Sequence, residues 1–218
     1  MTKLCIFDLD GTVLDTVGTI AHYGNLSLEK NGVEPIPVKE YNYLAGDGAR
    51  VLIRRMLEFR RSYTQELWER VYSDYMTAYD LAPTLGTSVF EGLKEVLDSL
   101  KGRGIDLAVV SNKPDPAAKA AIRTFYGEGY FSPVIGASDG LPLKPDPTAV
   151  LALAKAKGVS AADCLYVGDT STDMLTGKRA GMFTVGVLWG FRGREELLES
   201  GADAIIERPK ELLKYISE

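Results

Sequence analysis

The residues with the clearest chemical potential stand at positions 8–12, Asp-Leu-Asp-Gly-Thr, directly after the apolar run Leu4–Phe7. Side chains two residues apart in extended backbone leave on the same side, so the carboxyl groups of Asp8 and Asp10 share one small space. Two like charges this close repel, and only a cation or a shared proton makes the arrangement favourable. A Mg²⁺ ion would hold Asp8 ionised as a hard oxygen ligand and leave Asp10 free to carry a proton. The pattern thus indicates a metal-assisted reaction at two carboxylates.

Thr12, Ser111, Asn112 and Lys144 are the residues expected to bind an anion beside these carboxylates. Gly11 permits a tight turn, after which Thr12 offers a hydroxyl and a backbone N–H. Ser111 and Asn112 end an apolar run and offer a hydroxyl, an amide and backbone N–H groups. Lys144 stands among prolines, which would fix its cationic side chain. Taken singly, these residues are also compatible with turns and a solvated loop lysine.

A second pair of carboxylates, Asp169 and Asp173, follows the apolar run Leu165–Val167. Asp169 comes at the end of the run. Asp173 falls one turn into or just before the next helix, where its alternative role is to interact with the helix dipole. Because the carboxyl ends of parallel strands form one edge of a sheet, we expect all these polar groups to meet in a single site.

The elements that must position this site alternate between strand and helix from residue 83 onward. Short apolar runs predict buried strands, and the amphipathic stretches between them predict helices. Strands separated by helices in this rhythm imply right-handed crossovers and a fold of the α/β class, with a Rossmann-like parallel sheet. The predicted strands are Leu4–Phe7, Ile105–Val110, Val134–Ala137, Cys164–Val167, Phe183–Leu188 and Ala204–Ile206; the predicted helices are Glu91–Lys101, Asp115–Tyr126, Pro147–Lys157, Thr172–Arg179, Glu195–Ser200 and Pro209–Ile216.

The segment between the first strand and residue 83 has only helical periodicity. Turn signals rich in Gly, Pro and Asn separate its predicted helices. These helices are Thr16–Lys30, a short piece at Val38–Leu44, Gly48–Arg61 and Thr64–Tyr79. We therefore expect a small all-helical cap domain, residues 15–82, inserted into an α/β core made of residues 1–14 and 83–218.

The composition excludes several classes of protein. The chain has 218 residues, 45% of them hydrophobic, which is ordinary for a soluble globular protein of one large or two small domains. The net charge of −5, with no basic stripe, argues against nucleic acid as a partner. The sequence predicts neither a signal peptide nor a membrane anchor, so the expected location is the cytoplasm.

Together the four groups of polar residues resemble the motifs of the haloacid dehalogenase-like superfamily of phosphotransferases, and the resemblance spans the whole chain. It implies that Asp8 attacks phosphorus and carries a covalent aspartyl-phosphate. It also implies that Asp10 starts protonated, protonates the leaving oxygen and then takes a proton from water. The presence of an aspartic acid at position 10 favours phosphate chemistry over dehalogenation.

The same resemblance implies a set of ligands. Mg²⁺ would be bound by Asp8, the main-chain carbonyl of Asp10, Asp169 and water, with Asp173 acting through water or on the other ligands. Ser111 and Lys144 would hold the phosphoryl oxygens. The helical insertion resembles the mobile helical cap found in one branch of the superfamily.

Within that branch, the turn Gly46-Asp47-Gly48 and residues 187–191 resemble the phosphoglycolate phosphatase group and its pyrophosphatase and nucleotidase relatives. We therefore expect Mg²⁺-dependent hydrolysis of a small phosphate monoester, with phosphoglycolate favoured. Only the insertion can reach the part of the ester that points away from the sheet. Arg50, in the first turn of the next helix, is expected to contact the carboxylate of phosphoglycolate, so that Arg50→Ala would raise the KM.

Other readings stay open at this point. A pyrophosphatase, a 5′-nucleotidase or a sugar phosphomutase would use the same motifs. A receiver-like domain or a non-catalytic protein that binds phosphorylated metabolites is a more remote alternative, because a receiver has no helical insertion and a silent relative would be expected to lose Asp8 or Asp10. The expected partner is a small phosphorylated metabolite, and the chain would act as a monomer or homodimer.

Overall fold

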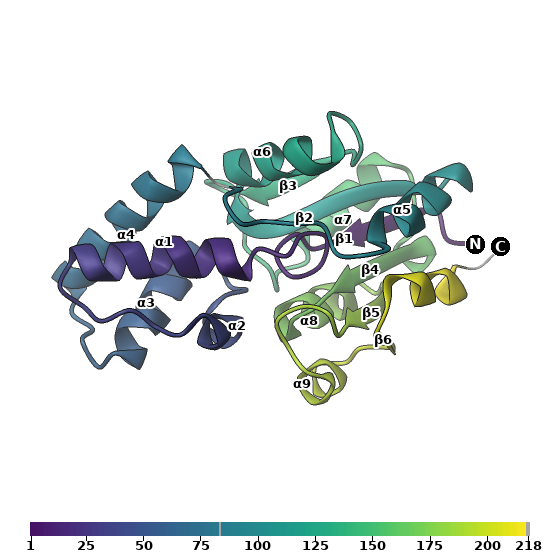
Figure 1. Cartoon of the computed structure of the whole chain (residues 1–218). Helices are drawn as coiled ribbons and strands as arrows, with labels where there is room; N and C mark the ends of the chain where they lie inside the picture. Colours follow the sequence, from purple (N-terminus) through teal and green to yellow (C-terminus); the bar gives the residue numbers. More distant parts are fainter. Residues whose placement is uncertain (83, 217–218) are drawn as a thin grey trace.

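The apolar run at the start of the chain forms β1 (Leu4–Phe7), and all four of its residues are buried. β1 pairs in parallel with β2 (Asp106–Pro114) on one side and with β4 (Cys164–Gly168) on the other. It is therefore an inner strand of a six-stranded sheet with the order β3-β2-β1-β4-β5-β6. The computed structural model, which describes residues 1–82 and 84–216, confirms the predicted α/β fold with a parallel sheet (Figure 1).

The remaining elements of the sheet domain follow the predicted order. The other strands are β3 (Val134–Ala137), β5 (Phe183–Val187) and β6 (Ala204–Ile206); the helices are α5 (Leu93–Gly102), α6 (Asp115–Tyr126), α7 (Thr148–Ala156), α8 (Ser171–Arg179) and α9 (Arg194–Glu199), with short 3-10 turns at Ala161–Asp163 and Pro209–Tyr215. The closing segment is thus a 3-10 turn where an α-helix was predicted.

Helices cover both faces of the sheet, which explains why its inner strands are apolar throughout (Figure 1). Side chains alternate along each strand. Cys5 and Phe7 of β1 pack in a cluster with α5 and α6, whereas Leu4 and Ile6 pack with α7 on the opposite face. Neither face of β1 can therefore hold a functional polar group, and such groups can appear only where the strand ends.

The part of the chain between β1 and α5 forms a separate helical layer beyond the end of the sheet (Figure 1). It consists of α1 (Val17–Lys30), a 3-10 turn (Val38–Glu40), α2 (Tyr41–Leu44), α3 (Ala49–Phe59) and α4 (Gln65–Leu81). This insertion has its own hydrophobic cluster, which Phe191 and Ala117 of the sheet domain also join. The predicted helical cap is thus present. Its predicted limits stay a prediction, and residue 83, at the second limit, lies outside the described residues, as do residues 217–218 of the predicted core.

β2 continues four residues beyond its predicted end at Val110. The register between β2 and β3 shifts between Val110 and Pro114, so the strand stays extended while its regular pairing is interrupted. Ser111, Asn112 and Lys113 therefore lie on extended backbone at the edge of the sheet that faces the insertion. Within the described residues, no helix is long and apolar enough to cross a membrane.

Candidate active site

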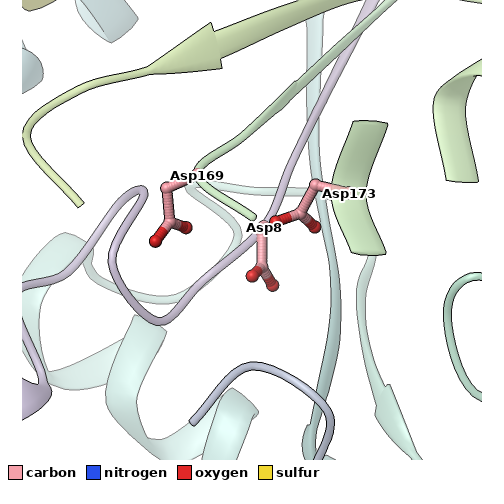
Figure 2. Close-up of side chains that lie close together, drawn as sticks. All are labelled: Asp8, Asp169 and Asp173. Atoms are coloured by element: carbon pink, nitrogen blue, oxygen red, sulfur yellow. The ribbon is translucent and has the colours of Figure 1, made fainter. Parts of the chain in front are cut away.

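Three buried carboxylates meet at the carboxyl end of β1 and β4. Each of Asp8, Asp169 and Asp173 offers one oxygen, and these oxygens all lie within 4.8 Å of one another. Asp8 extends from the end of β1, Asp169 follows β4, and Asp173 lies in the first turn of α8 (Figure 2). The structure thus brings Asp8 together with Asp169, which lies 161 residues later in the chain, and with Asp173.

Asp169 is fixed by two donors from distant parts of the chain. The hydroxyl of Thr12 donates to its Oδ1 at 2.7 Å, and the backbone N–H of Phe191 donates to its Oδ2 at 2.8 Å. The backbone N–H of Thr12 donates to Leu9 O. Both donors of Thr12 are thus used within the protein. In this structure Thr12 orients a carboxylate of the acidic cluster, and its binding of phosphate stays a prediction.

Asp173 combines a local and a distant role. Its backbone N–H and Oδ2 form a capping box with Thr170 at the start of α8, which satisfies donors that a helix N-terminus leaves free. Its Oδ1 accepts from Lys144 Nζ at 2.7 Å and from the hydroxyl of Tyr166 at 3.3 Å. Because both oxygens already have protein donors, Asp173 is well placed to orient Lys144.

Lys144 lies at the centre of the negative charge. Its Nζ is 2.8 Å from Asp8 Oδ1 and 2.7 Å from Asp173 Oδ1, and its side chain is 3% exposed. The side chain of Asn112 holds the loop around it, since its Nδ2 donates to Lys144 O and its Oδ1 accepts from Lys144 N. The amide of Asn112 is therefore used to position Lys144, and its binding of phosphate stays a prediction.

Burial and mutual repulsion perturb these groups. Desolvation, followed by the charge of Asp173, raises the pKa of Asp8 to about 7 despite the nearby ammonium of Lys144. Desolvation and the charges of Asp173 and Asp8 raise the pKa of Asp169 well above its ordinary value. Burial alone would lower the pKa of Lys144, but the carboxylates of Asp173 and Asp8 raise it. The pocket therefore carries more negative charge than its own residues compensate.

This excess charge fits a divalent metal ion. When all four carboxyls are ionised, the two lysines leave two negative charges to be neutralised; the six residues are Asp8, Asp10, Asp169, Asp173, Lys113 and Lys144. Asp8 Oδ1 is buried and makes no hydrogen bond of good geometry within the described residues, although Lys144 Nζ is near. Oxygen donors at close range suit a hard cation. Asp8 and Asp169 have the free lone pairs to hold one, with Asp173 beside them.

The metal-free protein is expected to lose stability as the pH rises from 3.8 to about 7, the interval between the ordinary and the folded pKa of Asp8. A raised folded pKa means that the folded state binds the extra proton, so the stabilisation is complete at low pH and disappears as that proton leaves. Thermal unfolding in a chelator, across this interval, measures the effect. In Asp8→Asn the unfolding temperature should fall less steeply with pH. An unchanged dependence of the unfolding temperature on pH would show that Asp8 does not titrate in this way.

Asp10 has a partner that the sequence analysis missed. Lys113 Nζ lies 2.9 Å from Asp10 Oδ1 and 2.5 Å from the hydroxyl of Tyr79 on α4. The carboxyl of Asp10 thus has a cation as its direct partner, where the sequence analysis had expected the neighbouring carboxylate to dominate. Lys113 follows Ser111 by two residues, so the extension of β2 and its alternation would have placed the two side chains together.

A small cavity of about 50 Å³ separates the sheet edge from the insertion. This is room for a few water molecules. Its floor includes Asp8, Asp10 and Ser111, and its roof comes from the insertion. The hydroxyl of Ser111 accepts only a long hydrogen bond, 3.3 Å, from Lys113 N, so it remains available to an anion in the cavity.

The turn Gly46-Asp47-Gly48 docks on the sheet domain. Asp47 accepts a 2.5 Å hydrogen bond from the Thr172 hydroxyl and pairs with Arg55 of α3. Gly48 has a φ of +87°, and a Cβ there would lie 3.3 Å from Asn112 O, so the close approach favours glycine. Gly46 and Gly48 line the cavity, but the side chain of Asp47 is committed to the contact between the two layers.

The structure does not bring Arg50 to the cavity. Its guanidinium lies 5.0 Å from the ring centroid of Tyr72 and 5.6 Å from that of Trp68, on an exposed part of the insertion. It is absent from the described residues that line the cavity. Stacking on these two aromatic rings of α4 gives the guanidinium a favourable partner outside the site. A contact between Arg50 and a substrate carboxylate stays a prediction, which this position does not support.

Accordingly, Arg50→Ala is expected to leave the KM for phosphoglycolate within about twofold of the unsubstituted value, because exposed cation–aromatic contacts contribute little and Arg50 is not among the described residues that line the cavity. Steady-state kinetics measure this. A rise of about tenfold, the loss of a charge-assisted contact, would instead return Arg50 to the site.

Comparison with known proteins identifies the family. Residues 5–187 match the family model of the haloacid dehalogenase-like hydrolases. The chain is 35% identical over 188 residues to the phosphoglycolate phosphatase of Neisseria gonorrhoeae, covering 85% of this chain and 79% of that protein. It is 32% identical over 216 residues to the phosphoglycolate phosphatase of Aquifex aeolicus, covering 98% and 96%.

Comparison of the fold with solved structures indicates the same family. A crystal structure from Lactobacillus delbrueckii subsp. bulgaricus superposes with a TM-score of 0.94 at 28% identity and covers 99% of both chains. Sheet, insertion and acidic cluster thus agree with the sequence match. The chain therefore belongs to the haloacid dehalogenase-like hydrolases, and its relatives place it among the phosphatases of that family.

Proposed function

We propose that the protein hydrolyses a small phosphate monoester, with phosphoglycolate as the favoured substrate, through a covalent aspartyl-phosphate at Asp8 and with Mg²⁺ as cofactor. One observation carries the proposal. Asp8 is a buried carboxylate at the end of the inner strand β1, it lines the cavity beneath the insertion, and it has both a lysine and two further carboxylates around it. This surrounding suits a nucleophile that must meet a dianionic phosphate.

In the first step a carboxylate oxygen of Asp8 attacks phosphorus, an O–P bond forms, and the bond from phosphorus to the ester oxygen breaks. Asp10, carrying a proton at this point, gives that proton to the departing oxygen. Lys144 and the hydroxyl of Ser111 hold the phosphoryl oxygens. In the second step Asp10 takes a proton from water, whose oxygen attacks phosphorus, and Asp8 is released with free phosphate.

The metal site fits this chemistry. Asp8 and Asp169 would hold Mg²⁺, with Asp173 beside them, and the main-chain carbonyl of Asp10 is the further ligand that the family resemblance suggests. When bound, the cation supplies positive charge that offsets the phosphate and the acidic cluster. Thr12 and the backbone N–H of Phe191 keep Asp169 oriented for this role.

Two observations support a small substrate. The cavity is small, about 50 Å³, so a nucleoside would require the insertion to move away. The relatives in Neisseria gonorrhoeae and Aquifex aeolicus are phosphoglycolate phosphatases. Both favour a short leaving group over the nucleotides and sugars that a nucleotidase or phosphomutase would bind.

A panel of phosphate esters tests the proposal. We expect phosphate release from phosphoglycolate with a kcat/KM at least about tenfold above that for pyrophosphate, a 5′-nucleotide or glucose 1-phosphate, and no turnover in a chelator. A higher kcat/KM for a nucleotide or pyrophosphate would contradict the proposed substrate. Transfer of the phosphoryl group to a sugar would indicate a mutase.

A further inference from the structure

Lys113 is a buried cation at the wall of the cavity. Its side chain is 4% exposed, and its Nζ contacts Asp10 from the sheet domain and the hydroxyl of Tyr79 from the insertion. An ammonium group has three N–H donors. Two of them point to Asp10 and Tyr79, and no other described residue accepts from the third. Lys113 thus retains one donor for an acceptor that enters the cavity.

The insertion presents mostly apolar side chains to the cavity. Ile20, Leu52 and Met76 of the insertion present apolar surface to the cavity. Among the described residues that line it, Lys113 carries the only positive charge. A charged leaving group buried against this surface would lose its hydration without compensation, unless it reached that cation. Among its described lining residues, the cavity therefore offers negative charge on the leaving group a single cationic partner.

That place is adjacent to the leaving oxygen. Asp10 must contact this oxygen to protonate it, and Lys113 Nζ lies 2.9 Å from Asp10 Oδ1. In an ester of glycolate, a single carbon joins the leaving oxygen to the carboxylate. The carboxylate of such a leaving group can consequently reach Lys113 while the ester oxygen stays beside Asp10. A carboxylate several carbons further along would extend past this cation.

We infer that Lys113, aided by the hydroxyl of Tyr79, forms a subsite for a carboxylate attached directly to the ester carbon, so that the enzyme selects phosphate esters of short 2-hydroxy acids. The inference rests on the proposed function and adds the residue that would give it its specificity. Tyr79 belongs to α4, so the subsite is complete only when the insertion lies over the sheet. Lys113 takes the role that the sequence analysis had assigned to Arg50.

Pairs of substrates that differ in one charged group separate recognition of a carboxylate by Lys113 from a general effect of Lys113 on catalysis. Phosphoglycolate and 2-hydroxyethyl phosphate have the same length, but the second has a hydroxymethyl group where the first has a carboxylate. Phospholactate and 1,2-propanediol 2-phosphate form a second pair. The quantity measured is the ratio of kcat/KM for the charged member to that for the uncharged member of each pair, in Mg²⁺.

Lys113→Met keeps most of the unbranched side chain, which becomes one atom shorter, and removes its charge. We expect this variant to lower the ratio at least about tenfold, which corresponds to the loss of one charge-assisted hydrogen bond. Any effect that Lys113 has through Asp10 lowers kcat/KM for both substrates and leaves the ratio unchanged. Lys113→Arg should recover part of the ratio. Lys94→Met, an exposed lysine on α5, is the matched control and should leave the ratio unchanged. An equal loss for both members of a pair would show that Lys113 acts only through Asp10 and would overturn the inference.

Tyr79→Phe provides a milder test if Lys113→Met does not fold. Removing the hydroxyl should raise the KM for the charged substrate several-fold, with a smaller change for its uncharged partner; equal changes would contradict the subsite.

The wild-type enzyme separates the inference from the proposed function. If phosphoglycolate is not preferred but phospholactate still exceeds its uncharged partner through Lys113, the proposed substrate fails and the subsite stands. If the uncharged member of both pairs is preferred, the subsite is wrong even where phosphatase activity is present.

Discussion

Asp8→Asn is expected to retain the fold and to lose phosphate release by several orders of magnitude. An amide oxygen is a far weaker nucleophile than a carboxylate, and it neutralises less of the charge of a metal ion. The fold should tolerate the change because Asn is close in shape, and burial already raises the pKa of Asp8 to about 7, which indicates that the site resists a negative charge there.

Phosphate release under single-turnover and steady-state conditions measures this effect, and circular dichroism monitors the fold. Asp106→Asn is a matched control, because Asp106 is an exposed carboxylate at the start of β2, far along the strand from the site. It should retain full activity. Substantial turnover by Asp8→Asn, confirmed free of deamidation by mass spectrometry, would mean that Asp8 is not the nucleophile.

Asp169→Ala is the second change with a large expected effect. Asp169 is fully buried, and its two oxygens are oriented by Thr12 and by the backbone of Phe191. Removing a residue that orients metal ligands typically weakens metal binding 10–100-fold, so loss of an oriented ligand should reduce Mg²⁺ affinity by about 100-fold or more. Activity should fall in parallel and return in part at high Mg²⁺.

Isothermal titration calorimetry with Mg²⁺ measures the affinity directly, apart from turnover. Asp98→Ala, an exposed carboxylate on α5, is the control and should bind Mg²⁺ normally. Ca²⁺ should replace Mg²⁺ poorly, because its looser and higher coordination misplaces the attacking carboxylate. Full turnover by enzyme treated with a chelator would remove the metal from the mechanism.

Phe191 connects the acidic cluster with the insertion. Its backbone N–H holds Asp169, while its side chain is buried in the hydrophobic cluster of the insertion. The next residue, Arg192, donates from its guanidinium to Ala45 O of the insertion at 2.9 Å. Gly190 must precede them, since a Cβ there would lie 2.3 Å from Asp169 Cβ. The loop after β5 therefore contacts both the acidic cluster and the insertion that roofs the cavity.

The sequence was sufficient to predict the sheet and the acidic cluster because both depend on short-range patterns. Leu4–Phe7 is apolar throughout since helices cover both faces of β1, and Asp8 follows it. The same pattern of a buried strand ending in a carboxylate places Asp169 after β4. Parallel pairing of β1 and β4 then brings the two carboxylates to one edge without any information about side-chain contacts.

The roles of individual polar side chains could not be predicted in this way. Thr12 and Asn112 looked free to bind phosphate because their partners, Asp169 and Lys144, are 157 and 32 residues away. Arg50 looked free to reach a substrate because its stacking on Tyr72 depends on how α3 packs against α4. Each of these contacts is decided by tertiary packing, which a linear pattern of residue types does not contain.

Lys113 was missed for a different reason. The apolar run that predicts β2 ends at Val110, and the polar residues after it are compatible with a turn, whereas the strand continues to Pro114. Interrupted pairing with β3 keeps this polar stretch extended. Had the extension been recognised, the spacing of Ser111 and Lys113 would have placed both side chains on the same side, as it did for Asp8 and Asp10.

Chemical trapping of the phosphoenzyme tests the central claim most directly. The enzyme is mixed with phosphoglycolate and Mg²⁺, quenched in acid on the millisecond scale, and reduced with borohydride, which converts an aspartyl-phosphate to homoserine. Peptide mass spectrometry then locates the modified residue. We predict homoserine at position 8, dependent on substrate and absent in Asp8→Asn. Homoserine at another position, or none while the quenched samples contain a burst of product, would contradict the assignment of Asp8 as the nucleophile.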